Sequence, residues 1–140
     1  MYKKNEKKPD GKKAHFENTM YKVGRVRYNS WATQVLKACD IVIYERELVH
    51  IRTYHGIDLE KIGFTTLDFV KIIIEKFNCI YKGSGNSFLL VMEKEPLSNV
   101  AAIELTINKN QKDTYKINTA LSIETKRLHK KKLLCANPAV

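Results

Sequence analysis

The sequence predicts an α+β domain in which N-terminal helices pack on an approximately four-stranded antiparallel β-sheet. A change of pattern along the chain supports this fold class. Before residue 78, apolar residues recur mainly at helical spacing, most regularly between residues 65 and 77. After residue 78, short runs rich in β-branched and aromatic residues alternate with turns that contain Gly, Asn or Asp, which is typical of an antiparallel meander.

The length and composition suit one domain with one hydrophobic core, because the chain has 140 residues of which 44% are hydrophobic. We expect this domain to span residues 15–140. Residues 1–14 are rich in lysine and hold almost nothing to bury, so they predict a flexible basic arm or a linker from a longer parent protein.

Three helices and one strand are expected in the first half of the chain. Asn29 or Ser30 can cap a short helix. The β-branched run at residues 40–44 predicts a strand, and the segment after it predicts a helix that ends at Gly56. The clearest helix covers residues 65–77. Its apolar side chains on one face are Leu67, Val70, Ile73, Ile74 and Phe77.

The second half predicts strands joined by short turns. Residues 79–82 and 87–93 are expected to form a β-hairpin around the Gly-rich turn at 83–86. Residues 99–108 predict the next strand, and residues 114–123 predict a strand whose side chains alternate with a period of two. The residues expected on one face of this last strand are Tyr115, Ile117, Thr119 and Leu121.

The net charge is strongly positive, at +10 from 25 Lys and Arg against 15 Asp and Glu. This excess predicts a polyanionic partner, namely a nucleic acid, an anionic membrane surface or an acidic protein. No apolar run is long enough for a transmembrane helix, so we do not expect membrane insertion. The three cysteines form no C-x-x-C pair and favour a reducing compartment.

The motifs of several common enzyme classes are missing. The sequence has no G-x-x-x-x-G-K-[ST] loop, no G-x-S-x-G elbow, no H-E-x-x-H motif and no carboxylate pair at metal-binding spacing. These absences argue against a nucleoside triphosphatase, a serine hydrolase and a zinc protease. We therefore expect neither a cofactor nor a metal.

The segment ELVHIRTYHG, residues 47–56, carries the groups needed to cleave RNA without a metal. The RNA 2′-hydroxyl attacks the phosphodiester when a base takes its proton, an acid protonates the leaving 5′-oxygen and cations neutralise the phosphate. Histidine suits both proton transfers, because its ordinary pKa is about 6.5. We therefore expect His50 or His55 to transfer protons and Arg52 to contact the phosphate.

Helix geometry limits this hypothesis. On an ideal helix the side chains of His50 and His55 point about 140° apart, so they would not both reach one phosphate. We expect only one of them to transfer protons, and we favour His55 because a helix end nearby lets the chain turn it toward the sheet. The alternative is that His50 is a core histidine beside Leu48 and Ile51.

Basic residues near the C-terminus predict a surface that binds RNA phosphates. Residues 124–134 are expected to form a short basic helix or a frayed end, and the last strand adds a further lysine. The residues expected to bind RNA are Lys116, Lys126, Arg127, Lys130, Lys131 and Lys132. The alternative for such a charge run is an ordinary solvated face.

Three segments together resemble a known superfamily. They are ELVHIRTYH, NCIYKGSGNSFLLVME and YKINTALSI, and with the basic residues after them the likeness extends over residues 40–133. The resemblance is to the phage- and mobile-element-associated branch of the barnase/EndoU/colicin/RelE-like (BECR) ribonuclease toxins. It implies helices packed on an antiparallel sheet, with RNA bound across the open face of that sheet.

The resemblance also implies an activity and a set of residues. The activity is metal-independent cleavage of RNA, often tRNA, that leaves a 2′,3′-cyclic phosphate, and it frequently comes with a neutralising immunity or antitoxin protein. Carried over by position, the catalytic residues implied are His50, His55, Tyr81, Lys82 and Thr119. The four residues between the two histidines depart from the pattern of the family, which leaves open which histidine is the acid or the base.

The leading hypothesis is therefore an antibacterial toxin domain with endoribonuclease activity. It would act in the cytoplasm of a target bacterial cell, either as the C-terminal domain of a longer secreted protein or as a small stand-alone toxin, and an acidic immunity protein would neutralise it. The first alternative is a non-catalytic basic module that binds nucleic acid. The second is an adaptor for an acidic partner.

Overall fold

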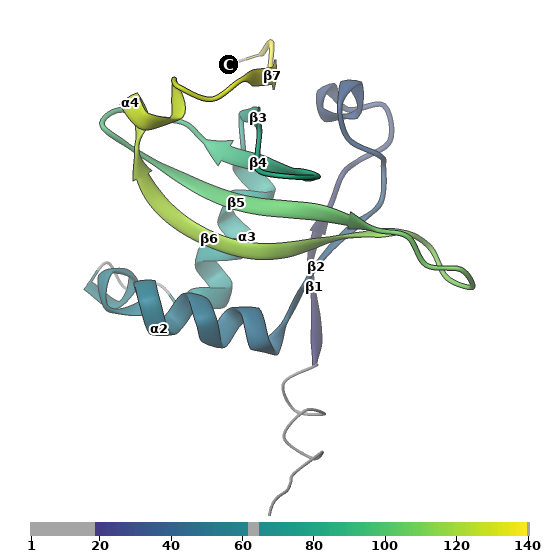
Figure 1. Cartoon of the computed structure of the whole chain (residues 1–140), viewed down its shortest axis with the longest axis horizontal. Helices are drawn as coiled ribbons and strands as arrows, with labels where there is room; N and C mark the ends of the chain where they lie inside the picture. The colour runs from purple at the N-terminus through teal and green to yellow at the C-terminus, as the bar shows by residue number, and fades with distance from the viewer. Residues whose placement is uncertain (1–18, 62–64, 140) are drawn as a thin grey trace, which may run out of the picture.

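A single mixed sheet of seven strands organises the chain (Figure 1). The computed structural model describes the backbone of residues 19–61 and 65–139, and the side chains of residues 19–53 and 65–139. The strand order is β1-β2-β6-β5-β4-β3-β7. The elements in chain order are β1 (Met20–Arg25), η2 (Trp31–Gln34), β2 (Asp40–Tyr44), α2 (Glu45–Lys61), α3 (Thr66–Lys76), β3 (Cys79–Lys82), β4 (Ser87–Met92), β5 (Leu97–Thr106), β6 (Thr114–Glu124), α4 (Thr125–Leu128) and β7 (Leu133–Ala136).

The prediction of N-terminal helices packed on a sheet of about four antiparallel strands is wrong. Strands β1 and β2 precede both long helices, and β2 pairs with β6 in parallel, which makes the sheet mixed. The predicted meander corresponds to β3, β4, β5 and β6, which are antiparallel neighbours, and the fold as a whole is α+β. Two edge strands were missed, because β1 buries only Val23 and β7 buries no residue fully, so neither has a clear apolar period.

The helices also differ from the sequence-based prediction. The helix expected from Asn29 or Ser30 is only the 3-10 turn η2, and the Ser30 side chain makes no cap hydrogen bond. Helix α2 does not end at Gly56 but continues to Lys61, because glycine adopts helical backbone angles as readily as the left-handed ones that end a helix. Helix α3 is confirmed, and the Thr65 side chain accepts a hydrogen bond from the Asp68 backbone N–H at 3.1 Å.

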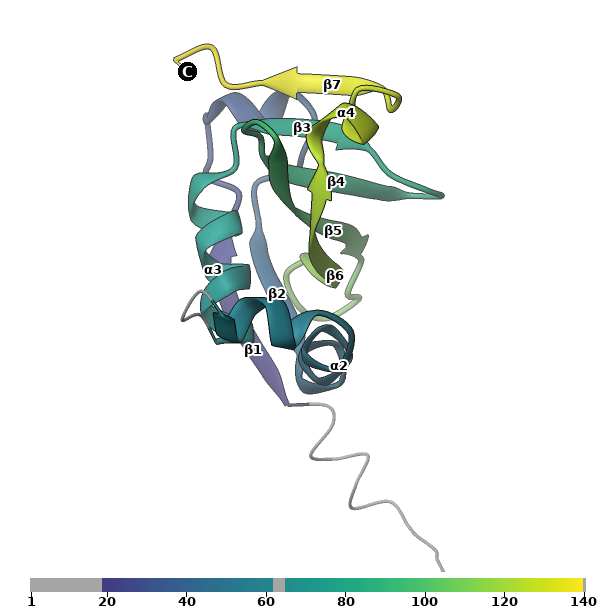
Figure 2. The same cartoon turned by 90° about the vertical axis from the view of Figure 1, so that its left-hand side faces the viewer.

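The sheet buries side chains on both of its faces. Its helix face packs against α2 and α3 and contains the larger core cluster, with residues such as Ile51, Ile73, Leu90 and Ile117. Its open face, which α4 covers at one end, carries a smaller cluster. The members of this second cluster are Tyr81, Val91, Val100 and Leu128. Figure 2 shows α3 on one side of the middle strands and α4 at the end of β6.

A β-bulge in β6 changes which residues face the helices. In the register with β5, Ile103 pairs with Ile117 and Ala102 pairs with Thr119, so Asn118 has no partner. One unpaired residue moves all following side chains to the other face. Tyr115 and Ile117 therefore belong to the helix-face core, whereas Thr119 and Leu121 face the other way, which contradicts the predicted uninterrupted alternation.

The structure describes the C-terminal segment but not the predicted N-terminal arm. The predicted basic arm, residues 1–14, lies outside the described residues. The C-terminal segment forms the short helix α4 and then β7, which pairs with β3. No helix in the described part of the chain is long and apolar enough to cross a membrane.

Candidate functional site

The open face of the sheet holds a groove of about 210 Å³, called the open-face groove below. Its floor comes from β4, β5 and β6, and its rim comes from α4, the segment after α4 and the turn between β3 and β4. The lining residues are Gly83, Ser84, Ser87, Leu89, Val100, Ala102, Thr119, Leu121, Ile123, Leu128 and Lys131. Thr119, a predicted catalytic residue, and Lys131, a predicted RNA-binding residue, therefore line the same groove.

The turn between β3 and β4 forms one rim of this groove. A Cβ on Gly83 would lie 2.3 Å from the Ser87 Oγ and 3.1 Å from the Ser87 carbonyl oxygen, so a larger residue here would displace the Ser87 hydroxyl. The Ser87 hydroxyl donates to the Ser84 carbonyl at 2.6 Å. The ammonium of Lys82, a predicted catalytic residue, donates to the carbonyls of Gly83 and Gly85. Lys82 therefore stabilises the turn in this conformation.

Tyr81, Glu93 and His129 form a hydrogen-bonded array beside the groove. The Tyr81 hydroxyl donates to Glu93 Oε1 at 2.6 Å, and His129 Nε2 lies 3.4 Å from Glu93 Oε2. Tyr81 packs in one cluster with Leu128, which lines the groove and directly precedes His129. The array and the groove are thus adjacent, and the His129 side chain is 53% exposed.

The array keeps Glu93 ionised at neutral pH. Burial by itself would raise the pKa of the Glu93 carboxyl, but hydrogen bonds from Tyr81 and His129 outweigh burial and hold that pKa below its ordinary value. Burial, followed by the hydrogen bond to Glu93, raises the pKa of Tyr81 far above its ordinary value. Burial and then the charge of Glu93 raise the pKa of the Cys79 thiol to about 11. Tyr81 and Cys79 are therefore neutral when Glu93 is charged.

Two buried hydroxyls position α4 and hence His129. Ser98 Oγ and Thr125 Oγ1 are 2.7 Å apart, and both residues are fully buried. The Thr125 hydroxyl also donates to the Lys94 carbonyl, and the Lys94 N–H donates to Ser98 Oγ at 3.2 Å. These bonds join β5, the start of α4 and the segment that directly follows Glu93.

The predicted residues of α2 lie elsewhere. His50 and Arg52 are exposed on α2, whereas Leu48 and Ile51 are buried, so His50 is not a core histidine. Helix α2 packs against β2 and β6, and β5 and β4 separate β6 from the strand that carries Tyr81. The structure therefore does not bring His50 and Arg52 together with Tyr81. The side chain of His55 lies outside the described residues.

The predicted RNA-binding residues lie in three places. Lys131 lines the open-face groove, and Lys116 pairs with Glu104 in the register of β5 and β6. The others are exposed around α4 and the segment after it: Lys126, Arg127, Lys130 and Lys132. Of the predicted RNA-binding residues, Lys131 is thus the one that lines the groove.

Glu93 and His129 were missed as site residues, although a signal for Glu93 was present in the sequence. Glu93 continues the alternation of Leu89 and Val91, which places a carboxylate at the end of an otherwise apolar face. His129 stands inside a run of lysines and arginine. No local spacing links two residues that are 36 positions apart.

Among the described side chains, those of residues 19–53 and 65–139, no three His, Cys, Asp or Glu residues gather in a way that could hold a metal ion. Comparison of the chain with models of protein families, with curated proteins and with solved structures gives no match.

Proposed function

We propose that this protein is an endoribonuclease that cleaves RNA on the open face of its sheet, by attack of the 2′-hydroxyl and without a metal. The observation that carries the proposal is the Tyr81–Glu93–His129 array beside the open-face groove. A carboxylate and an imidazole can serve as the base and the acid of this reaction. The positive charge of the chain, +10, favours a polyanionic substrate.

In the proposed reaction, ionised Glu93 takes the proton of the 2′-hydroxyl. The bond from phosphorus to the 2′-oxygen forms, the bond to the 5′-oxygen breaks, and protonated His129 gives its proton to the leaving 5′-oxygen. The products are a 2′,3′-cyclic phosphate and a free 5′-hydroxyl. The imidazole must turn away from Glu93 for the phosphate to enter, and their direct contact afterwards returns the proton from Glu93 to His129.

The groove supplies the remaining contacts. Lys131 is the cation that neutralises the phosphate oxygens, and the Thr119 hydroxyl donates a hydrogen bond to the substrate. The apolar floor, which includes Leu89, Val100 and Leu121, suits the face of a base. Tyr81 orients Glu93 through the 2.6 Å hydrogen bond.

The resemblance to BECR toxins supports a more detailed proposal. The substrate is a structured RNA such as tRNA, and the protein acts as an antibacterial toxin in the cytoplasm of a target cell, alone or as the C-terminal domain of a secreted protein. An acidic immunity or antitoxin protein neutralises it. Expression in a bacterial host, followed by a gel of total RNA, tests which RNA is cut.

The test of the site compares two histidines. Purified protein is incubated with tRNA in the presence of EDTA, and the ends of the products are analysed for a 2′,3′-cyclic phosphate. His129→Ala should lower the cleavage rate by about 100- to 10,000-fold, the usual effect of losing a proton-transfer group. His50→Ala removes an exposed histidine of α2 and should cleave at nearly the parental rate. Loss of cleavage in His50→Ala but not in His129→Ala would place the catalytic site on α2.

A basic nucleic-acid-binding module is the second candidate, and a second groove that is rich in cations favours it. One assay of RNA binding and cleavage distinguishes the two functions. Absence of cleavage of any RNA, with binding retained, would support the module and reject the nuclease. The unfolding transitions of both histidine variants serve as the control for folding.

A further inference from the structure

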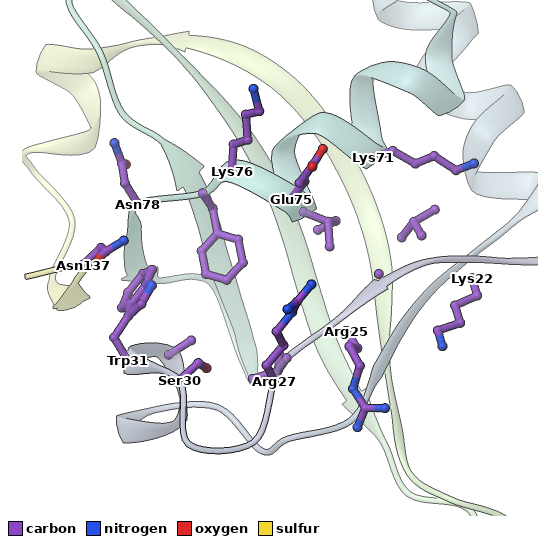
Figure 3. Close-up of a pocket in the computed structure, with 16 residues that line it drawn as sticks. Lys22, Arg25, Arg27, Ser30, Trp31, Lys71, Glu75, Lys76, Asn78 and Asn137 are labelled. Atoms are coloured by element: carbon purple, nitrogen blue, oxygen red, sulfur yellow. The ribbon is translucent and has the colours of Figure 1, made fainter. Parts of the chain in front are cut away.

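A larger groove lies between β1, η2 and the C-terminal part of α3, on a different side of the molecule from α4 (Figure 3). Its volume is about 560 Å³, within the usual range of ligand sites of about 300–1,000 Å³. We call it the cationic groove. Basic, aromatic and hydroxyl side chains line it, namely Lys22, Arg25, Arg27, Ser30, Trp31, Lys71, Lys76 and Phe77.

The cationic groove carries a clear excess of positive charge. Five of its lining residues are Lys or Arg, and Glu75 is its acidic residue. Lys22 Nζ and Arg25 Nη1 both form an ion pair with Asp40 Oδ1, at 3.4 Å and 3.7 Å. Within the part of the chain that the structure describes, the other three cations make no ion pair. These three are Arg27, Lys71 and Lys76.

One end of the groove is aromatic. The rings of Trp31 and Phe77 have centroids 5.4 Å apart and are tilted by 52°, and both residues are half-buried. The Ser30 hydroxyl is buried there and has no hydrogen-bond partner among the described residues. Figure 3 shows Trp31 and Ser30 at one end, Arg27 between η2 and α3, and Lys71 and Lys22 toward the other end.

We infer that the cationic groove binds single-stranded nucleic acid. Arg27, Lys71 and Lys76 contact the phosphates, and Trp31 provides a surface against which a base packs. An acidic protein would use the positive charge but would leave the aromatic end unused. The inference goes beyond the proposed function, because the groove lies outside the open face and its binding requires no cleavage.

Trp31 is the only tryptophan of the chain, so the groove contains its own fluorescent reporter. The probe is a 2′-O-methyl oligouridine, which keeps the phosphates and bases of RNA but lacks the nucleophile for the proposed cleavage. Titration of this probe into the intact protein should change the Trp31 emission to a saturating value. Binding without a change in Trp31 emission would overturn the inference.

Single lysine variants test the charge contacts. Lys71→Gln and Lys76→Gln should each weaken binding and reduce the slope of log Kd against log salt by about 0.7, the value for one phosphate contact with a single strand. Lys109→Gln is the matched control, because it removes one exposed lysine from the loop between β5 and β6. An equal effect of Lys109→Gln would mean that binding follows net charge and would reject the groove.

A polyanion without bases completes the test. Polyglutamate should bind more weakly than the oligouridine at equal salt and should leave the Trp31 emission nearly unchanged, because it has no base to pack against the ring. If polyglutamate binds as tightly and changes the emission equally, the groove is an anionic-protein surface and the inference is wrong. Because the probe cannot be cleaved, each result is independent of the cleavage assay.

Discussion

Glu93 links the catalytic proposal to the stability of the protein, because its two carboxylate oxygens contact different side chains. One accepts from Tyr81 and the other lies 3.4 Å from His129. The lowered pKa of Glu93 means that the folded state holds its charged form more strongly than the unfolded chain does. Glu93 is 26% exposed, so solvent screens this effect only in part.

The acid stability of the protein should depend on this carboxylate. The pKa of Glu93 is lower in the folded state, so its contribution to stability is present above the ordinary Glu pKa and is lost as pH falls through the folded pKa. Urea midpoints, measured between pH 6 and 3 by Trp31 fluorescence, should fall less steeply for Glu93→Gln than for the parent. Tyr81→Phe, which removes only the donating hydroxyl, should give an intermediate slope. Parallel curves for all three proteins would contradict the assignment.

Part of the candidate site was predictable from single residues, and part was not. Thr119 and Lys131 are both predicted functional residues, and they line one groove although no sequence pattern joins them. The bulge at Asn118 is the cause, because it turns Thr119 away from Tyr115 and toward the open face. His129 depends on the fold of a distant segment, and no local pattern distinguishes it from its basic neighbours.

At the scale of the elements, β1 packs closely against α3 at a glycine. A Cβ on Gly24 would lie 2.5 Å from the Cγ2 of Ile74, a β-branched side chain that is 4% exposed and has little freedom to move. The small residue therefore lets β1 pack against α3. Both residues line the cationic groove, so this contact also fixes one of its walls.

Gly24→Ala should destabilise the protein by about 1–3 kcal/mol, the usual cost of overpacking a core. The measurement is the free energy of unfolding in urea. In an Ile74→Ala background the obstructing Cγ2 is absent, so the same glycine substitution should cost much less. Equal costs in the two backgrounds would show that steric conflict with Ile74 is not the cause.

Elements with a strong local pattern were predictable, and elements made by distant pairing were not. Helix α3 combines a Thr65 cap with apolar residues at helical spacing, and β3 and β4 flank a Gly-containing turn. Strand β7 has four residues and pairs with β3, more than fifty positions earlier in the chain. Its pairing is non-local, and sequence periodicity carries no information about such partners.

At the scale of the whole molecule, the sheet brings both halves of the described chain together. Strand β2 lies beside β6 rather than beside β3, and β7 returns to pair with β3 and forms one edge of the sheet. The C-terminal strand also reaches the N-terminal part, because the Cys135 thiol lies 3.7 Å from the Trp31 carbonyl oxygen. Leu134 and Cys135 pack on the same core cluster as Trp31 and Val35.

This arrangement predicts one cooperative unfolding transition for the described domain. Trp31 reports on η2 and β7, whereas far-UV circular dichroism reports on the whole sheet and the helices. If one core joins these parts, the two signals should give the same midpoint in urea. Removal of residues 133–140 deletes β7 and exposes the edge of β3, so it should lower that midpoint and shift the Trp31 emission to longer wavelength. A Trp31 transition that precedes the loss of secondary structure in the full chain would instead make η2 and β7 a separate, weaker unit.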